Sequence, residues 1–109
     1  MSKYVSEDGK VGVLVSPGYG GGWSTWDREE REENICFDWS VVKWVLEGMP
    51  DAKRFKLDTA ERLDVYVGGM DNLEIKWVDI GTKFRIEQYD GHEYIQFEDD
   101  YKWETATIT

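Results

Sequence analysis

The hydrophobic and polar positions along the chain predict one short buried strand near its start. Residues 11–15 (Val-Gly-Val-Leu-Val) are a continuous apolar run, and its length and β-branched content favour a strand over a helix. Pro17 ends this strand because proline has no N–H to donate to a sheet. The polar residues 3–10 are expected to form a frayed start that turns at Asp8-Gly9.

A helix is expected over residues 39–47. Asp38 suits its N-cap position, Gly48 suits the C′ position, and Pro50 prevents the helix from continuing. The apolar stripe of this helix consists of Val41, Val42, Trp44, Val45 and Leu46. This stripe predicts that the helix packs on a sheet.

The segments beside this helix are expected to be short or irregular. Residues 35–37 indicate a short strand, residues 51–57 a linker, and residues 58–63 a single helical turn. Residues 65–67 alternate in the manner of a strand.

The dipeptide Asp90-Gly91 is typical of the two-residue turn of a β-hairpin. The register that this turn sets pairs Tyr89 with His92, Ile86 with Ile95, Phe84 with Phe97, Arg85 with Gln96 and Glu87 with Tyr94. Apolar residues then meet on one face of the hairpin, and a slip of one residue would destroy this sorting.

Alternation with a period of two begins at Leu73 and extends this pattern to a larger sheet. A turn at Gly81-Thr82 would bring Trp77 opposite Ile86. A further turn over residues 98–100 would lead into a last strand from Tyr101 to Ile108.

The predicted fold is therefore a single α+β domain over residues 1–109. Its antiparallel sheet, a C-terminal four-strand meander, packs against one main helix. The strand over residues 11–15 delivers the glycine-rich segment that follows it to one end of the domain.

The charge of the chain limits its partners. The formal net charge is −10, which disfavours nucleic acid and anionic membranes, since both need a basic surface. The charge favours basic proteins, cations or small ligands as partners, although it also serves solubility alone. No apolar stretch is long enough to span a membrane and no signal peptide is visible, so an intracellular location is expected.

The single cysteine, Cys36, excludes an internal disulfide and is expected to be a small buried hydrophobic residue. The chain also has a single histidine, His92, so zinc sites built from these residue types are excluded. His92 lies beside a hairpin turn, where we expect it to be exposed, and no serine or cysteine motif accompanies it. Neither Asp79 nor Glu87 is singled out by its spacing as a catalytic acid. The chain is therefore predicted to be non-enzymatic and to need no cofactor. The remaining alternative, a small hydrolase or transferase, would need a clustered pair of titratable groups that the sequence does not reveal.

Residues 16–26 (Ser-Pro-Gly-Tyr-Gly-Gly-Gly-Trp-Ser-Thr-Trp), which we call the glycine loop, are the most unusual segment. Strand, glycines and a possible helix start suit a phosphate-binding loop. However, Trp23 follows Gly22 where a P-loop has lysine.

Two interpretations of the glycine loop stay open. In the first, the loop binds a ligand or a partner through Tyr19, Gly20, Gly21, Gly22, Trp23 and Trp26. In the second, it is a tight structural crossing with both tryptophans in the core. The run of glycines favours a function, because each glycine costs backbone entropy on folding.

The acidic run over residues 27–33 follows the glycine loop and contains no apolar residue. It is expected to be a solvated helical turn or a mobile loop. As a binding surface it would offer a basic partner the carboxylates of Glu29, Glu30, Glu32 and Glu33. A cation held by this run or by residues 98–100 is a further alternative, but neither has the spacing of a known metal-binding loop.

Two strings carry a resemblance to a known group of proteins. Residues 10–26 (Lys-Val-Gly-Val-Leu-Val-Ser-Pro-Gly-Tyr-Gly-Gly-Gly-Trp-Ser-Thr-Trp) and residues 81–91 (Gly-Thr-Lys-Phe-Arg-Ile-Glu-Gln-Tyr-Asp-Gly) resemble a family of small uncharacterised bacteriophage proteins. The resemblance implies a phage origin and a location in the host cytoplasm. It assigns no role to any residue.

The first functional hypothesis is that the protein binds and inhibits a host factor, such as a defence protein, since small acidic phage proteins often act by binding. The acidic run and the aromatic side chains of the glycine loop would make the contact. The alternative hypothesis is a module that sequesters a small ligand, a nucleotide-type signal or a sugar, with the glycine loop.

Overall fold

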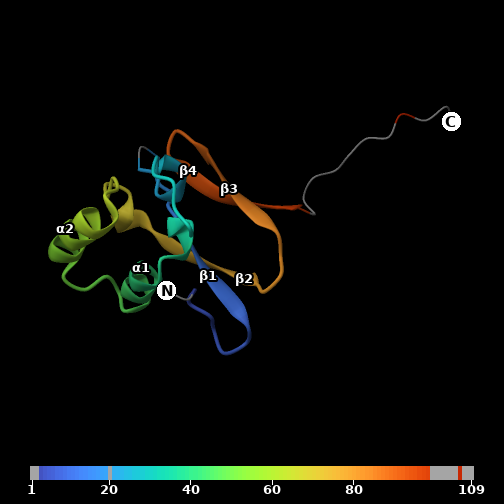
Figure 1. Ribbon diagram of the computed structural model, residues 1–109, viewed down its shortest axis with the longest axis horizontal. Helices are drawn as coiled ribbons and strands as arrows, with labels where there is room; N and C mark the ends of the chain where they lie inside the picture. The colour runs from blue at the N-terminus through green and yellow to red at the C-terminus, as the bar shows by residue number, and fades with distance from the viewer. Residues whose placement is uncertain (1–2, 20, 99–105, 107–109) are drawn as a thin grey trace.

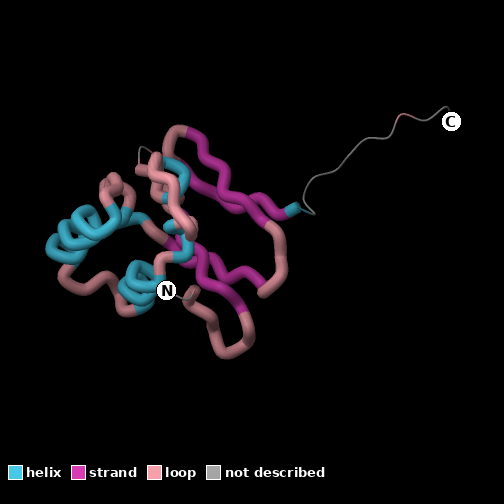
Figure 2. Tube along the Cα trace, in the orientation of Figure 1, coloured by secondary structure: helices cyan, strands magenta, loops and turns pink. Residues whose placement is uncertain are grey.

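The computed structural model describes residues 3–19, 21–98 and 106. Its helices and strands are β1 (Lys10–Val15), α1 (Trp39–Leu46), α2 (Ala52–Leu63), β2 (Glu74–Asp79), β3 (Phe84–Tyr89) and β4 (His92–Phe97). Short 3-10 turns lie at Ser24–Trp26, Ile35–Phe37 and Met70–Asn72. Figure 2 shows how loops connect these elements.

Over the residues that the structure describes, the fold is α+β, with two antiparallel sheets of two strands each. β1 pairs with β2, and β3 pairs with β4. In Figure 1 the helices lie to the left, the β1–β2 ribbon crosses the middle, and the β3–β4 ribbon lies above it. The β1–β2 ribbon therefore lies between the helices and the second hairpin.

Two clusters of buried side chains hold these layers together. On one face of the β1–β2 ribbon, Leu14 packs with Val41, Val42 and Trp44 of α1. On the other face Val13 and Val78 pack with Cys36, and side chains of the β3–β4 hairpin cover this cluster. β1 therefore buries both of its faces, which explains why its sequence is a continuous apolar run.

The predicted β3–β4 hairpin is confirmed in its register. Phe84 pairs with Phe97, Ile86 with Ile95 and Tyr89 with His92, and Arg85–Gln96 and Glu87–Tyr94 are also partners. Asp90 and Gly91 take φ angles of 49° and 84°, as a type I′ turn requires.

The predicted four-strand meander is wrong in the pairing of β2 with β3. β2 does not pair with β3; it pairs with β1, and Trp77 lies opposite Gly12, not opposite Ile86. The physical reason is that Ile75 and Val78 both pack into the core, from opposite faces of β2. A strand of this kind needs a neighbour that is apolar on both faces, which β1 provides. The predicted last strand, Tyr101 to Ile108, lies outside the described residues apart from position 106.

The predicted main helix is confirmed, although it ends at Leu46, with Glu47 as its C-cap, one residue earlier than predicted. α1 begins at Trp39, and the Asp38 side chain caps it by accepting from the N–H of Val41 at 3.1 Å. Gly48 follows with a φ of 88°, as a C′ glycine does.

The helix α2 contradicts the predicted linker over residues 51–57 and single turn over 58–63. The helix is continuous over Ala52–Leu63. Phe55 stacks on Trp44 of α1 with a ring-centroid distance of 4.7 Å. Packing on α1 thus stabilises a segment in which most side chains are polar or charged.

Two predicted short strands are also absent from the described chain. Residues 35–37 form a 3-10 turn, because the Asn34 side chain caps it by accepting from the N–H of Cys36. Residues 65–67 form no strand. Within the described residues, no helix is long and apolar enough to cross a membrane.

Candidate functional site

The glycine loop is built around a buried carboxylate from β4. Glu93 is 2% exposed. Its Oε1 accepts from the N–H of Ser16 at 2.9 Å. Its Oε2 accepts from the N–H of Trp23 at 2.8 Å and from the N–H and hydroxyl of Thr25 at 2.9 and 2.6 Å. The Glu93 N–H in turn donates to the carbonyl of Ser16 at 2.7 Å, so this residue joins β4 to both ends of the loop.

This arrangement bears directly on the phosphate-binding hypothesis. The N–H groups of Ser16, Trp23 and Thr25 converge on an anion, as they would around a phosphate. The anion, however, is the chain's own Glu93. The loop is thus an anion cradle that is filled from within.

The Thr25 hydroxyl is part of the same cradle. Its backbone N–H and its Oγ1 both donate to Glu93 Oε2. That oxygen also accepts from the N–H of Trp23, so its lone pairs are engaged and the carboxylate is enclosed. The contact between Thr25 and Glu93 therefore resembles a structural cap, not a nucleophile paired with its general base.

The glycine loop crosses a second segment that contains glycines, Gly68-Gly69. A Cβ on Gly21 would lie 3.0 Å from the Cα of Gly69, so the two backbones are in direct contact. The hydroxyl of Ser16 bridges them: it donates to the carbonyl of Gly21 and approaches the Gly69 carbonyl at 3.3 Å. This crossing fits the structural interpretation of the loop.

The aromatic residues of the loop have three different environments. Trp23 is 1% exposed, and its Nε1–H donates to the carbonyl of Ile35 at 3.2 Å. Tyr19 is 69% exposed and stacks on His92, with ring centroids 5.0 Å apart. Trp26 is half-buried and covers Gly22, where a Cβ would lie 2.7 Å from the indole Cγ. The structural interpretation of the loop therefore fits Trp23, whereas Tyr19 has the exposure that the binding interpretation requires.

The other predicted contact residues of the loop are its three consecutive glycines. Gly21 and Gly22 are buried, and Gly20 lies outside the described residues. His92, expected to be exposed, is half-buried beneath Tyr19, and its Nδ1 faces the carbonyl of Pro17.

The acidic run turns one of its two arginines inward and leaves its glutamates exposed. Arg31 turns inward and forms two hydrogen bonds to Asp27, at 2.6 and 3.2 Å. This hydrogen bonding, with help from the nearby Glu29 and Asp64, raises the pKa of Arg31. Five side chains of the run are left exposed, and four of them are acidic: Arg28, Glu29, Glu30, Glu32 and Glu33. The exposed acids are Glu29, Glu30, Glu32 and Glu33.

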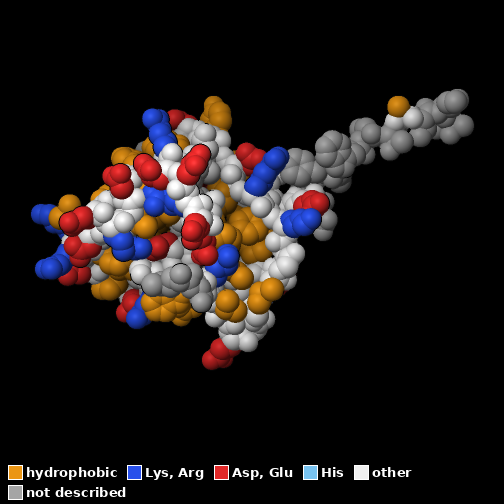
Figure 3. Space-filling view, viewed as in Figure 1, with side chains coloured by type: hydrophobic (Ala, Val, Ile, Leu, Met, Phe, Trp, Pro, Cys, Tyr) orange, Lys and Arg blue, Asp and Glu red, His pale blue; other side chains and the backbone are white. Residues whose placement is uncertain are grey.

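We call these four glutamates the acidic strip. Among the described residues, Lys3 forms an ion pair with the strip, since its Nζ lies 3.6 Å from a carboxylate oxygen of Glu33. Figure 3 shows acidic side chains, with basic ones among them, over the face of the molecule that it draws. The described residues contain no group of three or more His, Cys, Asp or Glu side chains placed to hold a metal ion.

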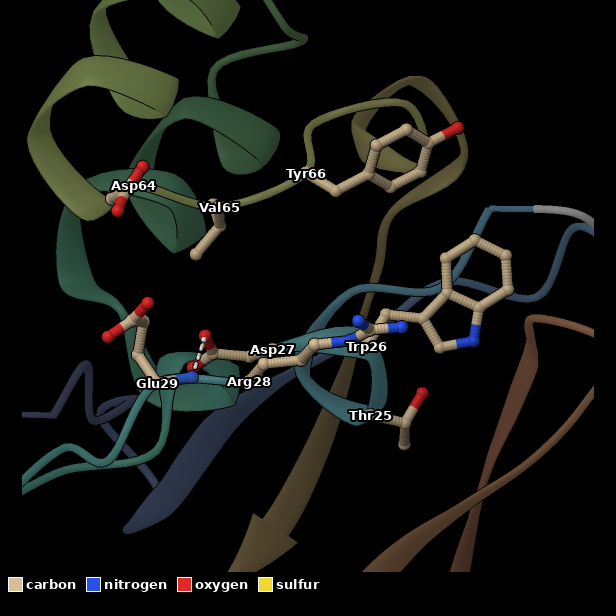
Figure 4. A pocket seen from close by; sticks show the side chains of 8 residues that line it. All are labelled: Thr25, Trp26, Asp27, Arg28, Glu29, Asp64, Val65 and Tyr66. Atoms are coloured by element: carbon tan, nitrogen blue, oxygen red, sulfur yellow. Dashed lines mark hydrogen bonds between the residues drawn. The ribbon is translucent and has the colours of Figure 1, made fainter.

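A cleft of about 670 Å³ opens between the end of the glycine loop and the segment that follows α2. Residues 25–29 line one side of it, and Asp64, Val65 and Tyr66 line the other. The rings of Trp26 and Tyr66 have centroids 5.7 Å apart at an interplanar angle of 38°. Figure 4 shows these rings at one end of the cleft, with the carboxylates of Glu29 and Asp64 at the other.

Three residues that the sequence analysis did not select contribute to this region: Glu93, Asp64 and Tyr66. A signal for Glu93 existed, because the predicted hairpin places it on the same face as Ile95 and Phe97. An acid on an apolar face must find buried donors. For Asp64 and Tyr66 we find no comparable signal, since the chain around them was expected to be a strand.

The predicted burial of Cys36 is confirmed, and it leads to a chemical prediction. Cys36 is 2% exposed, and burial raises the pKa of its thiol to about 12. The reactive thiolate is therefore scarce in the folded protein. We expect Cys36 to resist iodoacetamide at pH 8 and to react readily in urea, as measured by mass spectrometry. Equal labelling rates in both conditions would contradict this.

The same pKa shift predicts that the folded protein is less stable at alkaline pH. An unfolded cysteine ionises with a pKa of about 8.5, whereas folded Cys36 stays protonated up to a pH near its raised pKa of about 12. The unfolded state therefore loses this proton first, and the contribution of Cys36 to stability falls as the pH rises above about 8.5. A Cys36→Ala variant should lack this part of the alkaline decline in urea midpoints.

The comparisons with known proteins return no relative: no family model, no curated protein and no solved structure matches this chain.

Proposed function

We propose that this protein acts by binding a partner protein with a basic surface, and that the acidic strip makes the contact. The observation that carries the proposal is the outward orientation of Glu29, Glu30, Glu32 and Glu33, while Arg31 is turned inward against Asp27. A run of mixed charge thereby presents a surface that is mostly negative.

The net charge of the whole chain supports this proposal. At −10, the protein attracts a basic partner from a distance, and the local strip then orients it. Such attraction is screened by salt over about 8–10 Å. Binding should therefore weaken as the ionic strength rises.

The resemblance to phage proteins suggests the biological setting of this activity. In that setting the partner is a host factor, such as a defence protein, which is inhibited by being bound in the host cytoplasm. The activity is non-enzymatic and needs no cofactor. This part of the proposal rests on the resemblance and on the small size and acidity of the chain.

Charge reversal of the acidic strip provides the test. We expect the combined change of Glu29, Glu30, Glu32 and Glu33 to Lys to weaken capture of the dominant partner from host lysate by about tenfold or more. Quantitative mass spectrometry of the captured proteins, at low and high salt, measures this.

A matched control makes the same total change of charge elsewhere. Lysine replaces four exposed glutamates outside the acidic strip: Glu7, Glu47, Glu61 and Glu98. The control should keep most of the binding. Equal loss in both variants would show that only the net charge matters, and full retention in the strip variant would remove the strip from the proposal.

The second candidate function is the binding of a small ligand, and one observation favours it. Tyr19 is 69% exposed and rests on His92, which leaves a ring face open to a sugar or a nucleobase. Trp23 cannot contribute directly because it is buried. A thermal-shift panel of nucleotides and sugars, with Tyr19→Ala as the control variant, tests this candidate independently of the acidic strip.

A further inference from the structure

The cleft beside the acidic strip has two chemically different ends, one aromatic and one acidic. The rings of Trp26 and Tyr66 meet at one end. At the other end lie Glu29 and Asp64, both exposed. Val65 lies between the two ends and points into the cleft (Figure 4).

The two carboxylates are available to an external cation. Asp27, the third acid of the cleft, is already engaged by Arg31 in a bidentate contact. Within the described chain, the Glu29 and Asp64 side chains accept no hydrogen bond and form no ion pair; both act on Arg31 only at a distance.

We propose that this cleft receives a lysine or arginine side chain of the partner. The charged head would lie against Glu29 and Asp64, and the aliphatic stem would cover Val65 and the edge of the aromatic pair. This inference rests on the proposed function, because it names the anchor by which the same basic partner is held. The acidic strip supplies attraction, and the cleft supplies a fixed position.

Arg28 sets the strength of this interaction. It lines the cleft and extends along it toward Trp26 (Figure 4). Its charge opposes the entry of a second cation. Removal of this charge should strengthen binding of a cation and weaken binding of an anion, so Arg28 reports the sign of the ligand.

The test uses short peptides as defined probes. Acetylated and amidated Gly-Gly-Lys-Gly-Gly, its arginine counterpart and its glutamate counterpart are titrated against the full chain. The indole N–H resonance of Trp26 is followed by NMR, since Trp26 lines the cleft. A single anchor of this kind is expected to bind with millimolar affinity, which this method detects.

The variants are chosen to leave the fold intact. Asp64 has a φ of 53°, and asparagine tolerates this left-handed conformation, so Asp64→Asn removes only the charge. We expect Asp64→Asn and Glu29→Gln each to weaken binding of the cationic peptides by about threefold or more, and Arg28→Gln to strengthen it by a similar factor. Glu30→Gln, on the acidic strip but not lining the cleft, should have a smaller effect.

The outcomes separate this inference from the proposed function. Binding of the glutamate peptide that weakens in Arg28→Gln would overturn the inference, because the cleft would then be an anion site. No change at Trp26 with any peptide would also overturn it. If lysate capture still depends on the acidic strip in either case, the proposed function stands without the cleft.

Discussion

Replacement of Glu93 by alanine is expected to destabilise the protein by about 4 kcal/mol or more. The substitution removes the acceptor for three backbone N–H groups and one hydroxyl, which come from both ends of the glycine loop. Each buried donor left without a partner costs about 1–3 kcal/mol. A domain of this size has about 5–15 kcal/mol of stability in total, so the variant is expected to be largely unfolded at 37 °C.

The conservative variant Glu93→Gln separates hydrogen bonding from packing. Its amide oxygen can still serve one side of the cradle, but its NH₂ group must then face an N–H donor on the other side. We expect a loss of about 2 kcal/mol. Urea unfolding, with the slope compared among variants, measures both changes.

The exposed residue Glu98 provides the control for loss of a negative charge near the same strand. Glu98→Gln should change stability by no more than about 0.5 kcal/mol. If Glu93→Gln were equally mild, the carboxylate of Glu93 would not be what holds the glycine loop.

The β3–β4 hairpin was predictable in its register because the information is local. The Asp90-Gly91 turn sets the pairing, and the alternation on each side selects one register over its neighbours. The contact between β1 and β2 has no such local signal. Their partners, such as Gly12 and Trp77, are distant in sequence, and nothing near either strand indicates the other.

The helix α2 was missed because its buried face is only weakly apolar. Its inward positions are Ala52, Phe55, Thr59 and Leu63. Their spacing is helical, but a threonine and an alanine contribute little to a hydrophobic pattern. Thr59 is nevertheless 1% exposed, so burial depends on the neighbouring elements and not on the residue type alone.

The candidate site was predictable only in part, because most of its contacts join segments that are distant in sequence. The sequence indicated that the glycine loop is special and that an acidic run follows it. It did not indicate that Glu93 would fill the loop, that Arg31 would turn inward, or that Tyr66 would meet Trp26. Each of these is a contact between segments that only the complete fold brings together.

Replacement of Gly69 by alanine is expected to destabilise the protein by about 3 kcal/mol or more. Gly69 has ordinary helical angles, with φ of −89° and ψ of −2°, so the backbone itself would accept alanine. By conformational entropy alone this change would stabilise the protein by about 0.4–1 kcal/mol. However, the added Cβ would lie 2.7 Å from the carbonyl carbon of Gly21 and closer still to its oxygen. Neither backbone can relieve this overlap by rotating a side chain.

The glycine crossing can be tested by the order of three variants in urea unfolding. Gly81 has a φ of 90° with no atom within 4 Å of an added Cβ, so Gly81→Ala reports backbone strain alone, about 1–2 kcal/mol. Gly21→Ala meets the Cα of Gly69 at 3.0 Å and should also be destabilised, but less than Gly69→Ala. If Gly69→Ala proved no worse than Gly81→Ala, the two backbones would not be in close contact. The glycines would then be free of a packing role, and their excess would again favour a binding function for the loop.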